Sequence, residues 1–178
     1  LHDLLANSVR LLVKRLIATP DSDDYSLLYC AYAYWALEEK EEASKLWQQL
    51  LDRLPTHYMA KLGMVRYHID KKTFHEAKEL MLQLLDMDGQ DEEVLNLMSF
   101  TNDALIAEYQ DSLADPSTDA STRNNDTIEL GWCLFQNERP EDAVKLLENF
   151  PFDDDTEYSF ENLYGRLLYR IDRYEDAL

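Results

Sequence analysis

Three side chains in the middle of the chain have the types that could bind a metal ion. His68 and His75 lie seven residues apart, and Asp70 lies between them. Imidazole nitrogens and carboxylate oxygens are zinc ligands, so a turn that brought the three together could form a metal site. Zinc sites usually contain more closely spaced histidine or cysteine pairs, however. We therefore interpret these histidines as surface or packing residues and expect neither a metal nor a cofactor.

A run of acidic residues at 153–157, Asp-Asp-Asp-Thr-Glu, could offer oxygen ligands to calcium. The run lacks the glycine and the spaced acidic ligands of an EF-hand loop. It also precedes a predicted helix, where carboxylates cap free backbone N–H groups and interact favourably with the positive end of the helix dipole. A helix start therefore explains this run better than a calcium site does.

The sequence motifs of the common enzyme classes are absent. The chain contains no GxGxxG, GxxxxGKS/T, GxSxG or HExxH, and its four glycines are too few to build such loops. Cys30 and Cys133 occur singly within apolar stretches, without a CxxC pair, which is typical of small core residues. The sequence thus predicts that the chain is not an enzyme.

The charge of the chain argues against several kinds of partner. Seventeen basic side chains against 36 acidic ones give a net charge of −19, which repels phosphate backbones and anionic lipids. The most basic segment, Arg10 to Arg15, has no interleaved aromatic residues on which bases could stack. No apolar stretch approaches the length of about 18 residues that a membrane span needs, and the first residues do not resemble a signal peptide. We predict no nucleic-acid or membrane partner and a cytoplasmic location.

The composition favours helices throughout. Apolar residues make up 46% of the chain, and only four glycines and five prolines interrupt it. We predict an all-α protein that begins with a helix over about residues 3–18. Because the chain starts without Met and an apolar helical pattern begins near Tyr174, we also expect it to be a piece of a longer protein.

Small residues recur at a fixed interval. Ala43 and Ala77 are 34 residues apart, and so are Ala143 and Ala177. Each of these alanines stands three residues after a predicted helix start, and about 34 residues is the length of one unit in a class of helical repeats. Two equal intervals of that length indicate that the chain is built from repeated helix pairs.

The residues around each alanine follow the pattern of a helix hairpin. Ala43 is followed by Trp47 and Leu50, which form a buried stripe, and by Pro55, which ends the unit. Upstream, a small residue lies among apolar ones in Cys30-Ala-Tyr, Leu130-Gly-Trp and Tyr164-Gly-Arg. These residues resemble the tetratricopeptide repeat, best over 24–55. The resemblance implies antiparallel helix hairpins stacked as a right-handed α-solenoid.

The pattern weakens in the second unit and in the middle of the chain. The second unit, about 58–89, has Val65 at the small position, so we expect its first helix to pack less closely. Residues 91–113 are expected to form a degenerate hairpin or one bent helix. We therefore divide the chain into 1–114, with an N-terminal helix and hairpins, a linker at 115–125, and 126–178, with one hairpin and the start of another.

The resemblance also implies where a partner would bind. In the tetratricopeptide fold the first helices of successive hairpins line a concave groove. The residues expected there are Tyr25, Leu28, Tyr32, Trp35, Arg66, Trp132, Phe135, Asn162, Arg166, Tyr169 and Arg170. Aromatic residues and arginines are enriched at the centres of protein interfaces. The alternative is that aromatic residues at helical spacing form part of the core.

We therefore predict a protein-interaction scaffold that binds a peptide or protein partner in this groove. The carboxylate clamp of some tetratricopeptide domains is absent, because Leu28, Tyr32, Met59 and Gly63 stand at its polar positions. Segments 129–137 and 163–169 are also similar to repeat regions of some bacterial proteins that carry a J domain. A regulatory or targeting arm of a larger enzyme or co-chaperone is thus an alternative, as is self-association through apolar helix faces at the two ends.

Overall fold

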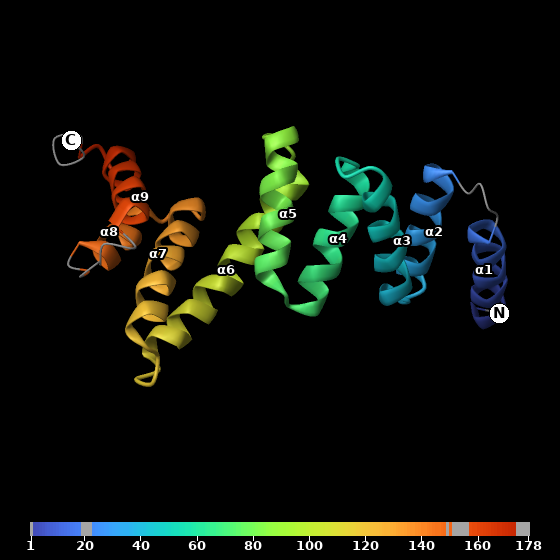
Figure 1. Cartoon of the computed structure of the whole chain (residues 1–178), viewed down its shortest axis with the longest axis horizontal. Coiled ribbons are helices and arrows are strands. Elements are labelled where there is room, and N and C mark those ends of the chain that lie inside the picture. Colours follow the sequence, from blue (N-terminus) through green and yellow to red (C-terminus); the bar gives the residue numbers. More distant parts are fainter. Residues whose placement is uncertain (1, 19–22, 149, 151–156, 174–178) are drawn as a thin grey trace. The chain divides into compact units, whose positions relative to one another are not determined.

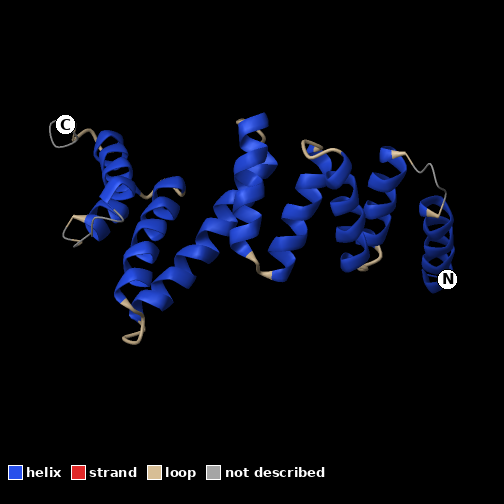
Figure 2. Ribbon diagram, in the orientation of Figure 1, coloured by secondary structure: helices blue, strands red, loops and turns tan. Residues whose placement is uncertain are grey.

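The computed structural model describes residues 2–18, 23–148, 150 and 157–173, and the side chains from residue 6 onward. All regular secondary structure in these ranges is helical (Figures 1 and 2), which confirms the predicted all-α class. The helices are α1 (His2–Ile17), α2 (Asp24–Ala36), α3 (Lys40–Arg53), α4 (Tyr58–Lys71), α5 (Phe74–Met87), α6 (Glu92–Ala114), α7 (Ala120–Gln136), α8 (Pro140–Leu147) and α9 (Glu157–Arg170). None of the described helices is long and apolar enough to cross a membrane.

The chain divides into two compact units, Leu1–Val94 and Leu95–Leu178. In unit 1, α2 pairs with α3 and α4 with α5, while α3 contacts α4 and α1 contacts α2 (Figure 1). These contacts confirm the predicted helix hairpins. The division between the units falls within α6 and not at the predicted linker.

Four helices end in the same backbone turn, which shows the repeat in the structure itself. The described non-glycine residues with positive φ are Glu38 (60°), Lys72 (60°), Glu138 (56°) and Asp172 (60°). Glu38 and Lys72 are 34 residues apart, and so are Glu138 and Asp172. The next residue in each case donates its N–H over 2.9 Å to the carbonyl five residues earlier: Glu39 to Tyr34, Thr73 to His68, Arg139 to Leu134 and Arg173 to Leu168. This is the hydrogen bond of a Schellman motif, which ends α2, α4, α7 and α9 at equivalent positions.

Side-chain caps explain where several helices begin. Asp23 accepts a hydrogen bond of 2.6 Å from the Ser26 N–H at the start of α2. Asp119 accepts from the N–H and the hydroxyl of Thr122 at the start of α7, at 3.0 and 2.7 Å. These hydrogen bonds stabilise the charged form of both side chains, so they hold the pKa of Asp23 and of Asp119 below its usual value. Because Asp119 caps α7, the loop before it is shorter than the linker predicted at 115–125.

The core of unit 1 is built around Trp47. Its side chain is fully buried, at 0% exposure, and its indole lies 5.6 Å from the rings of both Tyr32 and Trp35. A Cβ added to Gly63 on α4 would overlap this indole. Val65 is fully buried as well. The expected loose packing of α4 is therefore wrong, because Gly63 lets the helix approach Trp47 closely.

Unit 2 joins α7, α8 and α9 to the C-terminal part of α6. Residues 92–114 form one continuous helix, so the hairpin alternative for this segment is excluded. The Ser112 hydroxyl of α6 donates to Asp126 of α7 at 2.6 Å, and Asn137 donates to Asp103 at 2.8 Å, so α6 and α7 run antiparallel. A Cβ on Gly131 would lie 2.8 Å from Cδ2 of Leu163, which places α7 directly against α9.

Both cysteines lie in the core, as predicted, and their burial has a chemical consequence. Cys30 and Cys133 are both buried, and burial raises the pKa of the Cys30 thiol. Since the thiolate is the reactive form and must be accessible, we expect both thiols to react at least about tenfold more slowly in the folded chain than in denaturant. Absorbance measurements with Ellman's reagent, with and without urea, check this. Equal labelling rates in both conditions would contradict the burial of the thiols.

Candidate functional site

The predicted groove residues of unit 1 form an aromatic surface on α2 and α4, which we define by Tyr32, Trp35 and Arg66. Tyr32 and Trp35 are half-buried because both pack on Trp47. The Tyr32 hydroxyl donates to the backbone carbonyl of Met59 over 3.3 Å. Part of each ring is thus committed to the core, in line with the alternative that these aromatic residues are structural.

The positive charge of this unit-1 surface is already paired. Arg66 donates from Nε to Glu93 at 3.2 Å, and its Nη2 forms a salt bridge with the same carboxylate. Burial raises the pKa of the neighbouring Tyr32 phenol, while Arg66 lowers it and Glu93 raises it further. The unit-1 surface therefore offers ring faces to a partner but little unbalanced charge.

Two other predicted residues of unit 1 lie elsewhere. Leu28 is 8% exposed and belongs to the core cluster around Trp47, so little of its side chain is accessible to a partner. Burial of the apolar face that α2 turns toward its neighbours explains this. Tyr25 is 72% exposed, but it lines a separate cavity of about 350 Å³ with residues of α1 such as Leu12 and Leu16.

The predicted residues of unit 2 lie together on α7 and α9. The rings of Trp132 and Phe135 make an edge-to-face pair with centroids 6.1 Å apart. The Arg166 guanidinium carbon lies 5.8 Å from the centre of the Trp132 ring, within range of a cation–π interaction. Asn162 accepts a hydrogen bond of 2.8 Å from Nε of Arg166. These contacts position Arg166 without neutralising it.

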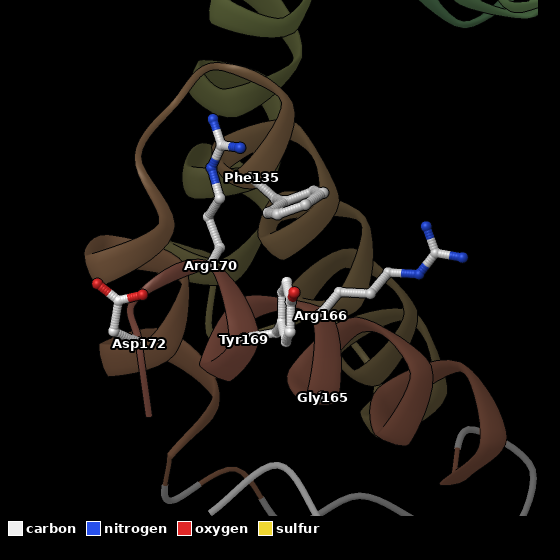
Figure 3. Close-up of a pocket in the computed structure, with 6 residues that line it drawn as sticks. All are labelled: Phe135, Gly165, Arg166, Tyr169, Arg170 and Asp172. Atoms are coloured by element: carbon white, nitrogen blue, oxygen red, sulfur yellow. The ribbon is translucent and has the colours of Figure 1, made fainter. Parts of the chain in front are cut away.

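A cavity of about 520 Å³ lies next to this cluster, and we call it the unit-2 pocket. It is lined by Phe135, Gly165, Arg166, Tyr169, Arg170 and Asp172 (Figure 3). Positions 166, 169 and 170 share one helix face because three- and four-residue spacings lie next to each other on a helix. Figure 3 shows the two arginine side chains extending on either side of the Tyr169 ring, with Phe135 contributed by the neighbouring helix. Tyr169 is 68% exposed, so its ring is available to a partner.

The charge of the unit-2 pocket differs from that of the unit-1 surface. Among the residues that the structure describes, neither Arg166 nor Arg170 forms a salt bridge, whereas Arg66 does. Arg170 lies in the last turn of α9, where the helix dipole favours a positive charge. Asp172 supplies one carboxylate to the lining, so the pocket carries two arginines against one aspartate.

The residues considered first for metal binding have other partners. Nδ1 of His68 lies 2.8 Å from the Thr73 hydroxyl oxygen, and burial lowers the pKa of this histidine. Asp70 accepts a hydrogen bond of 2.6 Å from Lys40. Over the described ranges no group of three His, Cys, Asp or Glu residues could hold a metal ion. Of the acidic run, 153–156 lies outside the described residues, and Glu157 begins α9.

Sequence reasoning missed two residues of the unit-2 pocket. Gly165 leaves open space, because a Cβ added there would meet no atom within 4 Å. Asp172 enters the lining at the turn that ends α9. Asp172 stands 34 residues after Glu138 at the same turn position, but no glycine marks either helix end, so the sequence alone did not reveal it.

Comparisons with known proteins give only distant similarities. No protein-family model and no curated protein matches the sequence. Among solved structures, the chain is similar to YrrB, which is described as a tetratricopeptide-repeat protein with an unusual peptide-binding site. The two share 17% identity with a TM-score of 0.45, and the match covers 93% of this chain and 87% of that one. It is also similar to a MamA mutant, with 14% identity and a TM-score of 0.40; the match covers 97% of this chain and 84% of that one. A MamA RS-1 double mutant is similar with 14% identity and a TM-score of 0.36, and this match covers 97% of this chain and 88% of that one.

All three TM-scores are low, so the description of the fold depends on the chain's own features. These are the paired antiparallel helices, the four equivalent helix ends and the 34-residue spacing. The chain is an all-α protein of tetratricopeptide-like helix hairpins.

Proposed function

We propose that this chain is a protein-interaction scaffold and that the unit-2 pocket is its main partner-binding site. The observation that carries the proposal is the combination of an exposed tyrosine, a half-buried phenylalanine and two arginines without salt bridges among the described residues. Tyr, Trp and Arg are the residues most enriched in the small set that supplies most of the binding energy at protein interfaces. The same surface would serve a free scaffold or a regulatory arm of a larger protein.

The unit-1 aromatic surface has a secondary role in this proposal. Tyr32 and Trp35 are anchored on Trp47, so their exposed edges form a rigid apolar surface. Rigid aromatic residues lose little conformational entropy when a partner binds. Because Arg66 is paired with Glu93, a contact here would depend on shape and apolar area more than on charge.

The proposal is tested by affinity capture from a native lysate with three forms of the chain. Tyr169→Ala removes the exposed ring from the pocket, and Tyr158→Ala is the matched control. Tyr158 lies on the same helix and is 79% exposed, but it does not line the pocket. We expect a partner that binds the parent chain and Tyr158→Ala, and whose yield falls about tenfold with Tyr169→Ala, as loss of a hot-spot residue implies.

Circular dichroism must show the same helicity for all three forms. If Tyr169→Ala captures the same proteins in the same amounts as the parent chain, or if the parent captures nothing specific, the pocket is not the binding site.

A further inference from the structure

The unit-2 pocket presents unbalanced positive charge on a strongly acidic chain. The chain carries a net charge of −19, and among the described residues its exposed cations commonly pair with carboxylates: Lys40 with Asp70, Lys71 with Glu41, Arg66 with Glu93. Within the described ranges Arg166 donates a hydrogen bond to the Asn162 amide and lies over the Trp132 ring, and neither Arg166 nor Arg170 forms a salt bridge there. A carboxylate from outside could therefore pair with either arginine without displacing an existing ion pair.

The positions of the two arginines define how many anionic groups they could hold. Arg166 and Arg170 are one helical turn apart, a rise of about 6 Å along α9. Their side chains leave the helix on either side of Tyr169 (Figure 3), so they do not converge on a single point. Alternate residues of an extended peptide are about 6.6 Å apart and point to the same side. Because the side chains diverge from that rise, they fit two carboxylates on the same side of an extended segment with one further residue of that side between them.

The aromatic lining adds a second element of selectivity. Phe135 and Tyr169 flank the cavity, and the apolar face that they offer would bury an aliphatic or aromatic side chain. In an extended peptide, a residue midway between two carboxylates that are four positions apart points to the same side as they do, where it would face Tyr169. Asp172 in the lining would repel a further acidic residue close to it.

We propose that the unit-2 pocket binds an extended acidic peptide segment with two Glu or Asp residues four positions apart and an apolar residue midway between them. The carboxylates pair with Arg166 and Arg170, and the apolar side chain packs on Phe135 and Tyr169. This inference deepens the proposed function and depends on it, since it names the class of partner for the same pocket.

A short acidic segment fits this chain better than a nucleic acid does. A long polyanion would bring phosphates close to the rest of a molecule with a charge of −19, which repels them. A short peptide places its negative charge only at the two arginines. The charge distribution therefore favours a peptide, and binding of a nucleic acid becomes an outcome of the test.

The test is fluorescence anisotropy with a labelled synthetic peptide of the pattern Glu-Ser-Leu-Ser-Glu. The comparison probes are the same peptide with Gln in place of both Glu residues and a labelled oligothymidine. Each is titrated with the whole chain and with the variants Arg166→Gln and Arg170→Gln. Arg139→Gln is the matched control, because Arg139 lies in the same unit, already forms a salt bridge with Asp142 and does not line the pocket.

We expect the acidic peptide to bind at least about tenfold more tightly than the Gln peptide, as expected for charge-assisted hydrogen bonds. Arg166→Gln and Arg170→Gln should each weaken binding about five- to tenfold, and Arg139→Gln should leave it unchanged. The affinity should fall as salt is raised, because exposed ion pairs are screened.

Equal affinity for the acidic and Gln peptides, or unchanged binding by both pocket variants, would overturn the inference. Tighter binding of the oligothymidine than of the acidic peptide would overturn it as well. A separate result would show that the proposed function is wrong, namely that Tyr169→Ala still captures the same lysate proteins as the parent chain. If Tyr169→Ala loses its partner while the acidic peptide fails to bind, only the acidic class of partner is wrong.

Discussion

Replacement of Trp47 with alanine is expected to destabilise unit 1 by about 3–5 kcal/mol, the usual cost of truncating a large buried aromatic side chain. Trp47 is fully buried and is the common contact of Tyr32, Trp35 and Gly63. Its removal leaves a cavity between the two hairpins of this unit and releases the rings that form the unit-1 surface. Urea denaturation followed by circular dichroism measures the loss in the free energy of unfolding.

The matched control is Tyr25→Ala, which removes an aromatic residue that is 72% exposed and should change the stability by about 0.5 kcal/mol or less. Trp47→Phe is expected to cost clearly less than Trp47→Ala. It keeps most of the apolar volume and removes an indole N–H that is buried without a hydrogen-bond partner among the described residues. A Trp47→Ala chain as stable as Tyr25→Ala would show that α3 and α4 do not pack as described.

Gly63→Ala is expected to destabilise the chain by about 1–3 kcal/mol, although alanine is normally the better helix former. The added Cβ would overlap the Trp47 indole, which is enclosed by two other rings and cannot move away freely. Gly165→Ala is the matched control, because a Cβ there meets no atom within 4 Å. This second substitution should stabilise the chain by about 0.5–1 kcal/mol through the lower conformational entropy of the unfolded state.

The two glycine substitutions thus have opposite expected signs in similar helical positions. Thermal unfolding of the parent chain and both variants measures them directly. If Gly63→Ala raises the melting temperature as Gly165→Ala does, the close approach of α4 to Trp47 is refuted.

The arrangement of charges has a consequence for how the two units would contribute to binding. In unit 1 the salt bridge between Arg66 and Glu93 holds two helix surfaces together and leaves the aromatic edges to provide contact area. In unit 2 Arg166 is held by the Asn162 amide and the Trp132 ring, which orient its side chain but leave its charge available. Specificity would therefore come mainly from unit 2.

The sequence alone determined the helices, the repeat length and the core positions Ala43, Trp47 and Leu50. These features depend on local patterns, namely apolar spacing, small residues and helix breakers within a single hairpin. The equivalent helix ends at Glu38, Lys72, Glu138 and Asp172 follow the same period, but no glycine marks them, so the sequence did not reveal them.

Only the tertiary structure decided which of the predicted partner residues remain available. Leu28 is buried because the apolar face of α2 is covered by its neighbours. Arg66 is paired because Glu93, 27 residues later, lies beside it. Arg166 and Arg170 carry no such salt bridge among the described residues. Which charges meet depends on the packing of helices that are distant in the sequence, and no pattern within a single helix contains that information.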